Sequence, residues 1–106
     1  MKAVILKAFG GVENLVYQDI EKPKINENEV LIKVIAIGIN PVDIKVRNRK
    51  APLAEDLAHF NPLILGWDVS GEIVEVGNKV TRFHIGDEVF GMINFIGHGK
   101  AYAEYV

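Results

Sequence analysis

The segment from Glu29 to Ile39 constrains the fold more than any other part of this sequence. Residues 30–37 are apolar at both even and odd positions, and Lys33 is the single charge among them. Successive side chains of a strand point to opposite faces of its sheet, and β-branched residues such as Val and Ile favour strands. The segment therefore predicts a strand that is central in a sheet and covered on both faces.

Shorter segments of similar character are separated by turn-forming residues. Strands are expected around residues 4–6, 15–20, 62–77, 88–90 and 101–106, with turns at 10–11, 26–28, 77–78 and 86–87 and an exposed loop at 97–100. Residues 50–61 are expected to form a loop with room for one helical turn. Gly71 interrupts a β-branched run and indicates a bulge or a close backbone approach. Short strands at close spacing favour a barrel or a sandwich.

One helix is predicted directly after the long strand. Asn40 is a favoured N-cap, and Pro41 suits the first helical position. Asp43 lies in the first turn, where a carboxylate complements the helix dipole. Asp43 and Arg47 are spaced for an i,i+4 ion pair with the acid first. We expect the helix to run to about Asn48.

Composition excludes several classes of protein. The 106 residues fit one domain and contain no cysteine, so disulfides, thiolate chemistry and the commonest ligand of structural zinc are absent. The net charge of −2 gives no attraction toward nucleic acid or an anionic membrane. No apolar run approaches the ~18 residues of a membrane span, and the apolar stretch at residues 3–6 is too short for a signal peptide. We therefore expect a cytoplasmic protein. The apolar fraction of 49% indicates either a dense β core or a surface that a missing partner covers.

Most candidate chemical sites have ordinary structural interpretations. The sequence has no G-x-G-x-x-G and no P-loop, so nothing in it cradles a pyrophosphate. His59, His84 and His98 are not at metal-ligand spacing and are expected to be solvated. Ser70 is the only serine and does not suggest a catalytic triad. A basic cluster is expected to be a solvated helix face; its members are Lys45, Arg47, Arg49 and Lys50.

Four segments, in this order and at this spacing, give the chain a resemblance to the N-terminal half of the medium-chain dehydrogenases/reductases. They are Gly38–Asp43, Leu65–Gly71 with Gly77 after it, Val80–Gly91, and Ala101–Val106. The resemblance covers essentially the whole chain. It implies a mainly β fold, the GroES-like partly open β-barrel with one or two short helices. The Rossmann domain that follows in this family, and that binds the nicotinamide cofactor, is absent from residues 1–106.

Departures from the family pattern indicate the branch. In the zinc alcohol dehydrogenases the position of Asn40 is a cysteine ligand, and the position of Trp67 is a histidine ligand in a G-H-E motif that here is Gly66-Trp67-Asp68. A tetrahedral zinc site cannot form from these residue types. Asparagine at the first position resembles the zinc-free NADPH:quinone oxidoreductase branch, where it lines the nicotinamide pocket.

The resemblance implies four cofactor-binding or pocket residues, and each has a second interpretation. Asn40 either caps the helix or also donates to the cofactor or acceptor, and the two roles are compatible. Trp67 is either a packed core aromatic or a flat wall for a planar acceptor. Asp68 either accepts backbone hydrogen bonds or faces the pocket. Lys45 stands where quinone reductases can carry a tyrosine, so the acceptor is left open.

The implied activity is hydride transfer from NADPH (or NADH) to a quinone or an activated alkene such as an enone, without zinc. The implied partners are that small acceptor and the chain's own Rossmann domain, and a homo-oligomer is left open. No catalytic residue is assigned. A non-enzymatic structural or interaction domain of the same fold is the alternative. A free-standing β-barrel binding module is a third hypothesis, and the alternating apolar residues at 101–106 disfavour it. Because the sequence stops within this apparent strand, we expect a fragment.

Overall fold

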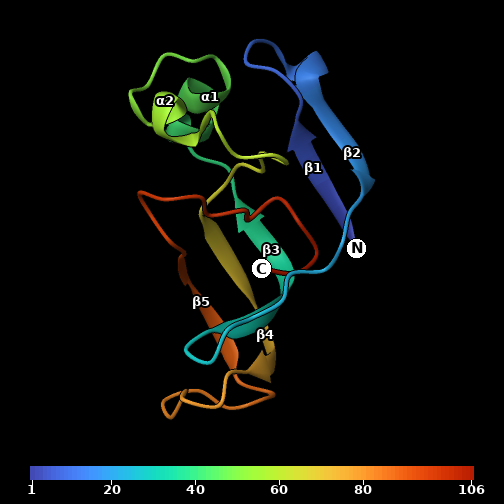
Figure 1. Ribbon diagram of the computed structural model, residues 1–106, viewed down its shortest axis with the longest axis vertical. Coiled ribbons are helices and arrows are strands. Elements are labelled where there is room, and N and C mark those ends of the chain that lie inside the picture. The colour runs from blue at the N-terminus through green and yellow to red at the C-terminus, as the bar shows by residue number, and fades with distance from the viewer.

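The computed structural model describes residues 1–106 as two antiparallel sheets and two short helices (Figure 1). The first sheet pairs β1 with β2, and the second has the order β3-β4-β5. The elements are β1 (Lys2–Leu6), a 3-10 turn (Val12–Asn14), β2 (Leu15–Asp19), β3 (Val30–Gly38), α1 (Pro41–Arg47), α2 (Leu53–Leu57), β4 (Asp68–Val76) and β5 (Glu88–Met92). The two sheets do not close into a full barrel, so the expected mainly β, partly open fold is confirmed. Neither helix is long and apolar enough to cross a membrane.

The strand predicted at residues 29–39 forms as β3, but its surroundings differ from the prediction. β4, not β3, is central in the three-stranded sheet. The register between them shifts near Val34, opposite Gly71. A Cβ at Gly71 would lie 2.2 Å from the carbonyl oxygen of Lys33, so the close backbone approach expected there is confirmed. Beyond the shift one face is open, because the Ile35 side chain is 74% exposed, and the predicted cover on both faces is wrong for this half of the strand.

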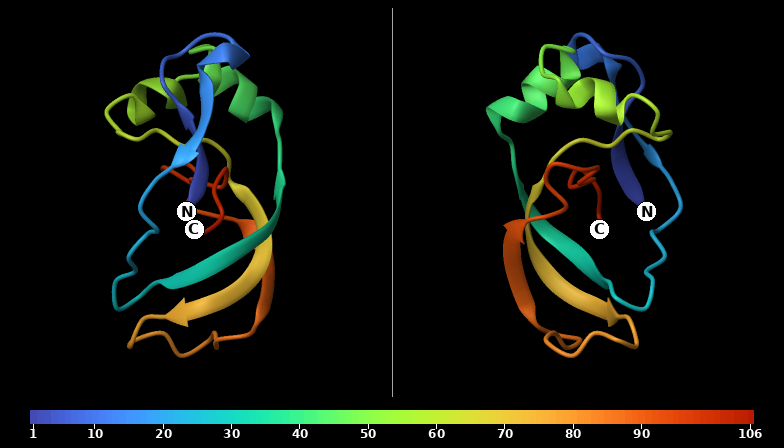
Figure 2. Two further views of the ribbon diagram at one scale, coloured as in Figure 1. Left: turned by 90° about the vertical axis from the view of Figure 1, so that its right-hand side faces the viewer. Right: turned by 60° about the vertical axis from the view of Figure 1, so that its left-hand side comes forward.

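The C-terminal segment joins the two sheets. The Val4 N–H donates to the Tyr102 carbonyl at 2.8 Å, and the Val34 N–H donates to the Glu104 carbonyl at 2.8 Å. Figure 2 shows the two termini close together between the sheets. The sequence predicts a continuous strand at residues 101–106, whereas the structure has only isolated bridges there. The segment contacts β1 and β3 in turn, so neither pairing is long enough to make it a regular strand.

The core lies between the helices and the sheets. Its largest cluster packs β1, both helices and the segment before β4 around Trp67, which is 2% exposed. Residues 63–67, expected to belong to a strand, are buried and belong to no regular strand, and β4 begins only at Asp68. Their carbonyl groups accept isolated backbone hydrogen bonds from β1 and from the C-terminal segment. The ring of Tyr102 packs against all three hydrophobic clusters. This residue therefore connects parts of the core that lie far apart in the sequence.

Two expectations about polar side chains are wrong. Arg47 does not pair with Asp43: its Nε donates to the Gly10 carbonyl at 3.1 Å, because the buried Asp43 carboxylate points into the core. The loop at residues 97–100 is not exposed, since His98 is only 8% exposed and packs against Phe60. A Cβ at Gly99 would lie 2.4 Å from the Gly66 carbonyl oxygen, so this loop packs directly on the backbone before β4.

Candidate functional site around Asn40 and Asp68

Asn40 and Asp68 meet at one end of the three-stranded sheet. Asn40 follows the last residues of β3, and Asp68 is the first residue of β4. The antiparallel register places Gly38 opposite Asp68, and a Cβ at Gly38 would lie 3.0 Å from the Asp68 Cβ. Asn40 Nδ2 donates to Asp68 Oδ2 at 2.8 Å. The pairing of β3 with β4 thus brings together two of the four residues that the sequence nominated.

The predicted cap at Asn40 is confirmed. The residue has the extended backbone of an N-cap, with φ −120° and ψ 158°, and forms a capping box with Asp43. In that box the Asn40 N–H donates to Asp43 Oδ2 at 3.2 Å. An asparagine amide nitrogen carries two N–H donors, and Asp68 occupies one of them. Asn40 is therefore a helix cap that still has one donor for a ligand.

A second contact of Asp43 stabilises the capping box. Asp43 is 2% exposed, and its Oδ2 accepts the Tyr102 hydroxyl at 2.5 Å. Its Oδ1 has no hydrogen-bond partner. Burial, followed by the hydrogen bond to Asp43, raises the pKa of Tyr102, so its hydroxyl is protonated and donates at neutral pH. The sequence analysis missed this contact, and nothing in the sequence signals it, since the partners are 59 residues apart.

An open hollow of about 530 Å³ lies beside the Asn40–Asp68 pair. Cross-strand neighbours of β4 and β5 line this hollow: Asp68 is opposite Met92, and Ser70 is opposite Phe90. Phe90 is 89% exposed and Met92 is 62% exposed. The hollow therefore has polar side chains along β4 and a large apolar surface along β5. Such a surface suits a flat ring with a polar substituent at its edge.

Of the four nominated residues only Asp68 lines this hollow, and Asn40 is joined to it by the hydrogen bond to Asp68. The other two lie elsewhere. Trp67 lies in the core, where its Nε1 donates to the Gly97 carbonyl at 2.7 Å and its ring meets Phe95 edge-on, with centroids 5.7 Å apart. Its core interpretation matches the geometry, and the indole anchors the loop at residues 94–100. Lys45 is exposed on α1 and makes no side-chain hydrogen bond or ion pair. The structure does not bring it into contact with Asn40 or Asp68.

The residues present do not fit a tetrahedral zinc ion. No three His, Cys, Asp or Glu side chains converge closely enough to hold a metal. The indole nitrogen of Trp67, at the position of a histidine ligand in the zinc enzymes, offers a donor and no lone pair. That donor is already bonded to Gly97. Asn40 likewise directs its amide nitrogen at Asp68.

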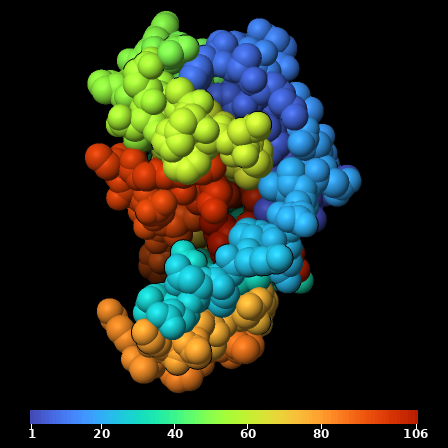
Figure 3. Space-filling view, in the orientation of Figure 1, coloured from blue at the N-terminus to red at the C-terminus, as the bar shows by residue number.

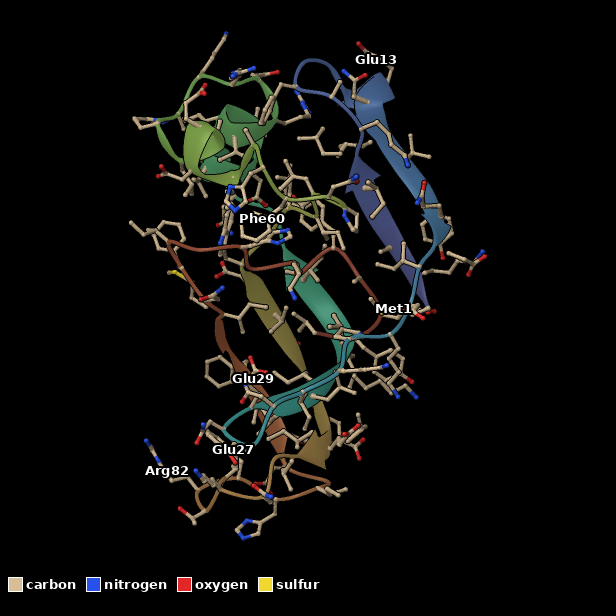
Figure 4. The ribbon with its side chains drawn as sticks, viewed as in Figure 1. Met1, Glu13, Glu27, Glu29, Phe60 and Arg82 are labelled. Atoms are coloured by element: carbon tan, nitrogen blue, oxygen red, sulfur yellow. The ribbon has the colours of Figure 1, made fainter.

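His98 occupies a separate buried position that the sequence analysis missed. Its Nε2 accepts the Ile64 N–H at 3.1 Å, and its ring stacks at 4.3 Å from Phe60, which lies beneath the helices (Figure 4). Burial, the nearby Lys100 charge and, more weakly, His59 lower the pKa of His98 to about 4, so the ring is neutral at pH 7. It lines a hollow of about 770 Å³ that opens below the C-terminal segment in Figure 3. This hollow shares no lining residue with the one beside Asp68.

Comparison with known families gives the identity of the domain. The sequence pattern of the alcohol dehydrogenase GroES-like domain matches residues 26–106. The chain belongs to this family. Within it, the chain is 41% identical to the quinone oxidoreductase of Lama guanicoe over 99% of its own residues and 30% of that protein. It is 39% identical to the chloroplastic NADPH-dependent alkenal/one oxidoreductase of Arabidopsis thaliana, over 89% of its residues and 24% of that protein.

A solved relative shares the fold closely. The quinone oxidoreductase of Coxiella burnetii is 42% identical and superposes with a TM-score of 0.95 over 100% of this chain and 33% of its own. The GroES-like domain described here thus spans between 24% and 33% of the length of these relatives. The expected membership of the alcohol dehydrogenase superfamily, on the side of the quinone oxidoreductases, is confirmed.

Proposed function

We propose that this GroES-like domain is the N-terminal, substrate-facing part of an NAD(P)H-dependent oxidoreductase that transfers hydride to a quinone or an activated alkene without zinc. The observation that supports this most is the Asn40–Asp68 hydrogen bond, because Asp68 lines a hollow together with the exposed apolar side chains of β5. The family relatives named as quinone and alkenal/one oxidoreductases support the reaction class. The cytoplasmic location remains a prediction, since one of these relatives is chloroplastic.

The chain's own residues would position and shelter the reacting groups. The second N–H of Asn40 would donate to a carboxamide or acceptor oxygen, while Asp68 holds the amide in place. Met92 and Phe90 would cover a planar ring and exclude water from it. The nicotinamide supplies the hydride when it is bound. A quinone can take its protons from water, so the absence of an assigned catalytic acid is consistent with this reaction.

The pyrophosphate end of the cofactor would be held elsewhere. The chain has no glycine-rich phosphate loop, and its relatives are three to four times longer, as their matched shares of 24% to 33% imply. We therefore assign the cofactor's main binding surface to a Rossmann domain outside residues 1–106. The nicotinamide end of the cofactor would contact the GroES-like domain at the open face of β3 and β5, beside Asn40.

A chimera tests the proposal. The matching third of the Coxiella burnetii enzyme is replaced by residues 1–106, which share its fold at a TM-score of 0.95. We expect NADPH-dependent reduction of a quinone that persists after chelation, with less than one zinc per chain by elemental analysis. Asn40→Ser, which keeps a capping oxygen, should lower kcat/KM by roughly 5- to 150-fold, as expected for one lost hydrogen bond.

Lys45→Ala is the matched control, because Lys45 is exposed on the same helix and contacts neither Asn40 nor Asp68. It should leave kcat/KM unchanged. A folded chimera without NADPH turnover would instead favour the non-enzymatic interaction domain. Residues 1–106 alone should bind NADPH no tighter than millimolar, about −4 kcal/mol, and micromolar binding in a titration calorimeter would place the cofactor site in this domain.

A further inference from the structure

The hollow beside His98 has no part in the function proposed above. Its volume of about 770 Å³ is within the range of small-molecule sites. Its floor is apolar, because Val30, Ile32 and Ile93 belong to one hydrophobic cluster and also line the hollow. None of its lining residues lines the hollow beside Asp68. The two hollows can therefore hold different molecules.

His98 presents an unused hydrogen-bond donor to this hollow. Its Nε2 accepts the Ile64 N–H at 3.1 Å, so the proton of the neutral ring is on Nδ1. Asp43 Oδ1 is the only fully buried side-chain polar atom that lacks a partner, so the unpartnered Nδ1 of His98 is reached by solvent. His98 lines the hollow, although the residue is only 8% exposed. A well-buried donor is thus left for a ligand.

Lys100 adds an unpaired positive charge to the same hollow. It is one of two half-buried lysines, and the other, Lys2, pairs with Asp19. Lys100 has no acidic partner. Its φ of +65° is in the left-handed region, which few residues other than glycine and asparagine enter. Such a backbone persists where the surrounding structure fixes it, and it is common at ligand sites.

Side-chain and backbone hydrogen bonds fix the loop that carries both groups. Trp67 Nε1 donates to the Gly97 carbonyl at 2.7 Å. Asn94 Nδ2 donates to the His98 carbonyl at 3.0 Å, and the Asn94 carbonyl accepts the Gly97 N–H. The donors of the hollow are therefore in position before a ligand arrives, which lowers the entropic cost of binding.

The two carboxylates that line the hollow lie away from His98. Burial first, and then the Lys100 charge, lower the pKa of His98, and neither Asp56 nor Glu29 is close enough to raise it. Glu29 lies well below Phe60 in Figure 4, and Phe60 stacks on the His98 ring at 4.3 Å. Asp56 is exposed on α2. The end of the hollow at His98 is therefore positive and rich in donors.

We propose that this hollow binds a small organic carboxylic acid. The carboxylate accepts the His98 Nδ1–H and pairs with the Lys100 ammonium, while the apolar part of the ligand lies on Phe60 and on the apolar floor. A carboxylate suits these groups because hydrogen bonds between charged partners are short and strong. A neutral ligand would leave the half-buried ammonium without a counter-ion, which is unfavourable.

Titration of residues 1–106 with octanoate, followed by NMR, tests this assignment. We expect a Kd between roughly 0.01 and 1 mM. The His98 Nδ1–H signal should move in a long-range ¹H–¹⁵N correlation spectrum, because this proton is donated to the carboxylate. 1-Octanol has the same apolar chain without the charge and should bind at least ~10-fold more weakly.

Lys100→Asn removes the charge and keeps a residue that tolerates the left-handed backbone. It should weaken octanoate binding by roughly 5- to 20-fold and leave octanol binding unchanged. Lys45→Gln is the matched control, since it removes an equal charge from an exposed position of α1 outside the hollow. It should bind octanoate as wild type does. The chimera described above should bind octanoate in the same way as residues 1–106.

Four results would each overturn the proposal. Octanol that binds as tightly as octanoate would reduce the site to apolar association. Equal effects of Lys100→Asn and Lys45→Gln would show that the Lys100 charge does not contact the ligand. A His98 Nδ1–H signal that does not move would place the ligand elsewhere. Loss of octanoate binding in the chimera would mean that another part of the enzyme fills the hollow. None of these measurements requires quinone reduction, so they are independent of the proposed function.

Discussion

Replacing Tyr102 by phenylalanine would test the contact on which the candidate site rests. The change removes only the hydroxyl that donates to Asp43 Oδ2 at 2.5 Å, and it keeps the ring that packs on all three core clusters. The Asp43 carboxylate is 2% exposed, and its Oδ1 already lacks a partner. Without the hydroxyl, the Asn40 N–H at 3.2 Å is the one hydrogen bond left to its side chain.

A hydrogen bond to a buried charged group contributes ~1.5–3 kcal/mol, so we expect Tyr102→Phe to lower the free energy of unfolding by about 2 kcal/mol. For a chain of this size that corresponds to a fall in Tm of roughly 8–16 °C. The loss is a large fraction of the ~5–15 kcal/mol that holds a typical domain together. The measurement is urea denaturation followed by circular dichroism, with Tm from calorimetry.

Tyr105→Phe is the matched control, because the Tyr105 hydroxyl makes no hydrogen bond and its ring contact with Lys22 is kept. It should change the free energy of unfolding by less than ~0.5 kcal/mol. Equal effects of the two substitutions would refute the reasoning. That result would mean that Asp43 is satisfied by solvent and that Tyr102 contributes by ring packing alone.

Three further predictions concern other contacts. Between pH 7 and pH 4, wild type should lose up to ~3 kcal/mol through His98, because the unfolded chain takes up the proton near pH 6.5 and the folded one only at about 4; His98→Gln should flatten this part of the pH profile. Asn40→Asp should destabilise the fold by ~1–3 kcal/mol, because it faces the Asp68 carboxylate, and adding Asp68→Asn should recover most of the loss. Gly71→Ala should cost at least ~2 kcal/mol in chemical denaturation, because its Cβ would lie 2.2 Å from a backbone oxygen.

Each of these has a result that would contradict it. An unchanged pH profile in His98→Gln, while His84→Gln behaves like wild type, would show that acid sensitivity arises elsewhere. Destabilisation of Asn40→Asp that persists after Asp68→Asn would show that the loss comes from the cap and not from repulsion. A Gly71→Ala variant as stable as wild type would mean that β3 shifts away from β4 at little cost.

Local features of the sequence were enough to predict α1 and most of the strands. The Asn40-Pro41 start and the Asp43 of the first turn predict α1, because capping acts within four residues of chain. The apolar run at residues 29–39 predicts β3, and Gly71 predicts the close approach of β3 to β4. The family resemblance supplied the partly open topology. These signals depend on neighbouring residues or on the order of motifs along the sequence. They can therefore be recognised without knowing the tertiary structure.

Only the tertiary structure decided which polar groups meet. The Asn40–Asp68 and Tyr102–Asp43 hydrogen bonds span 28 and 59 residues, and His98 reaches Ile64 across 34. A side chain's partner depends on strand register and on how a loop folds back, and neither follows from residue type or local spacing. His98 illustrates this, because a loop rich in glycine predicts exposure, whereas packing against the segment before β4 buries it and lowers its pKa. Sequence thus set the local backbone, and long-range packing set the chemistry of the site.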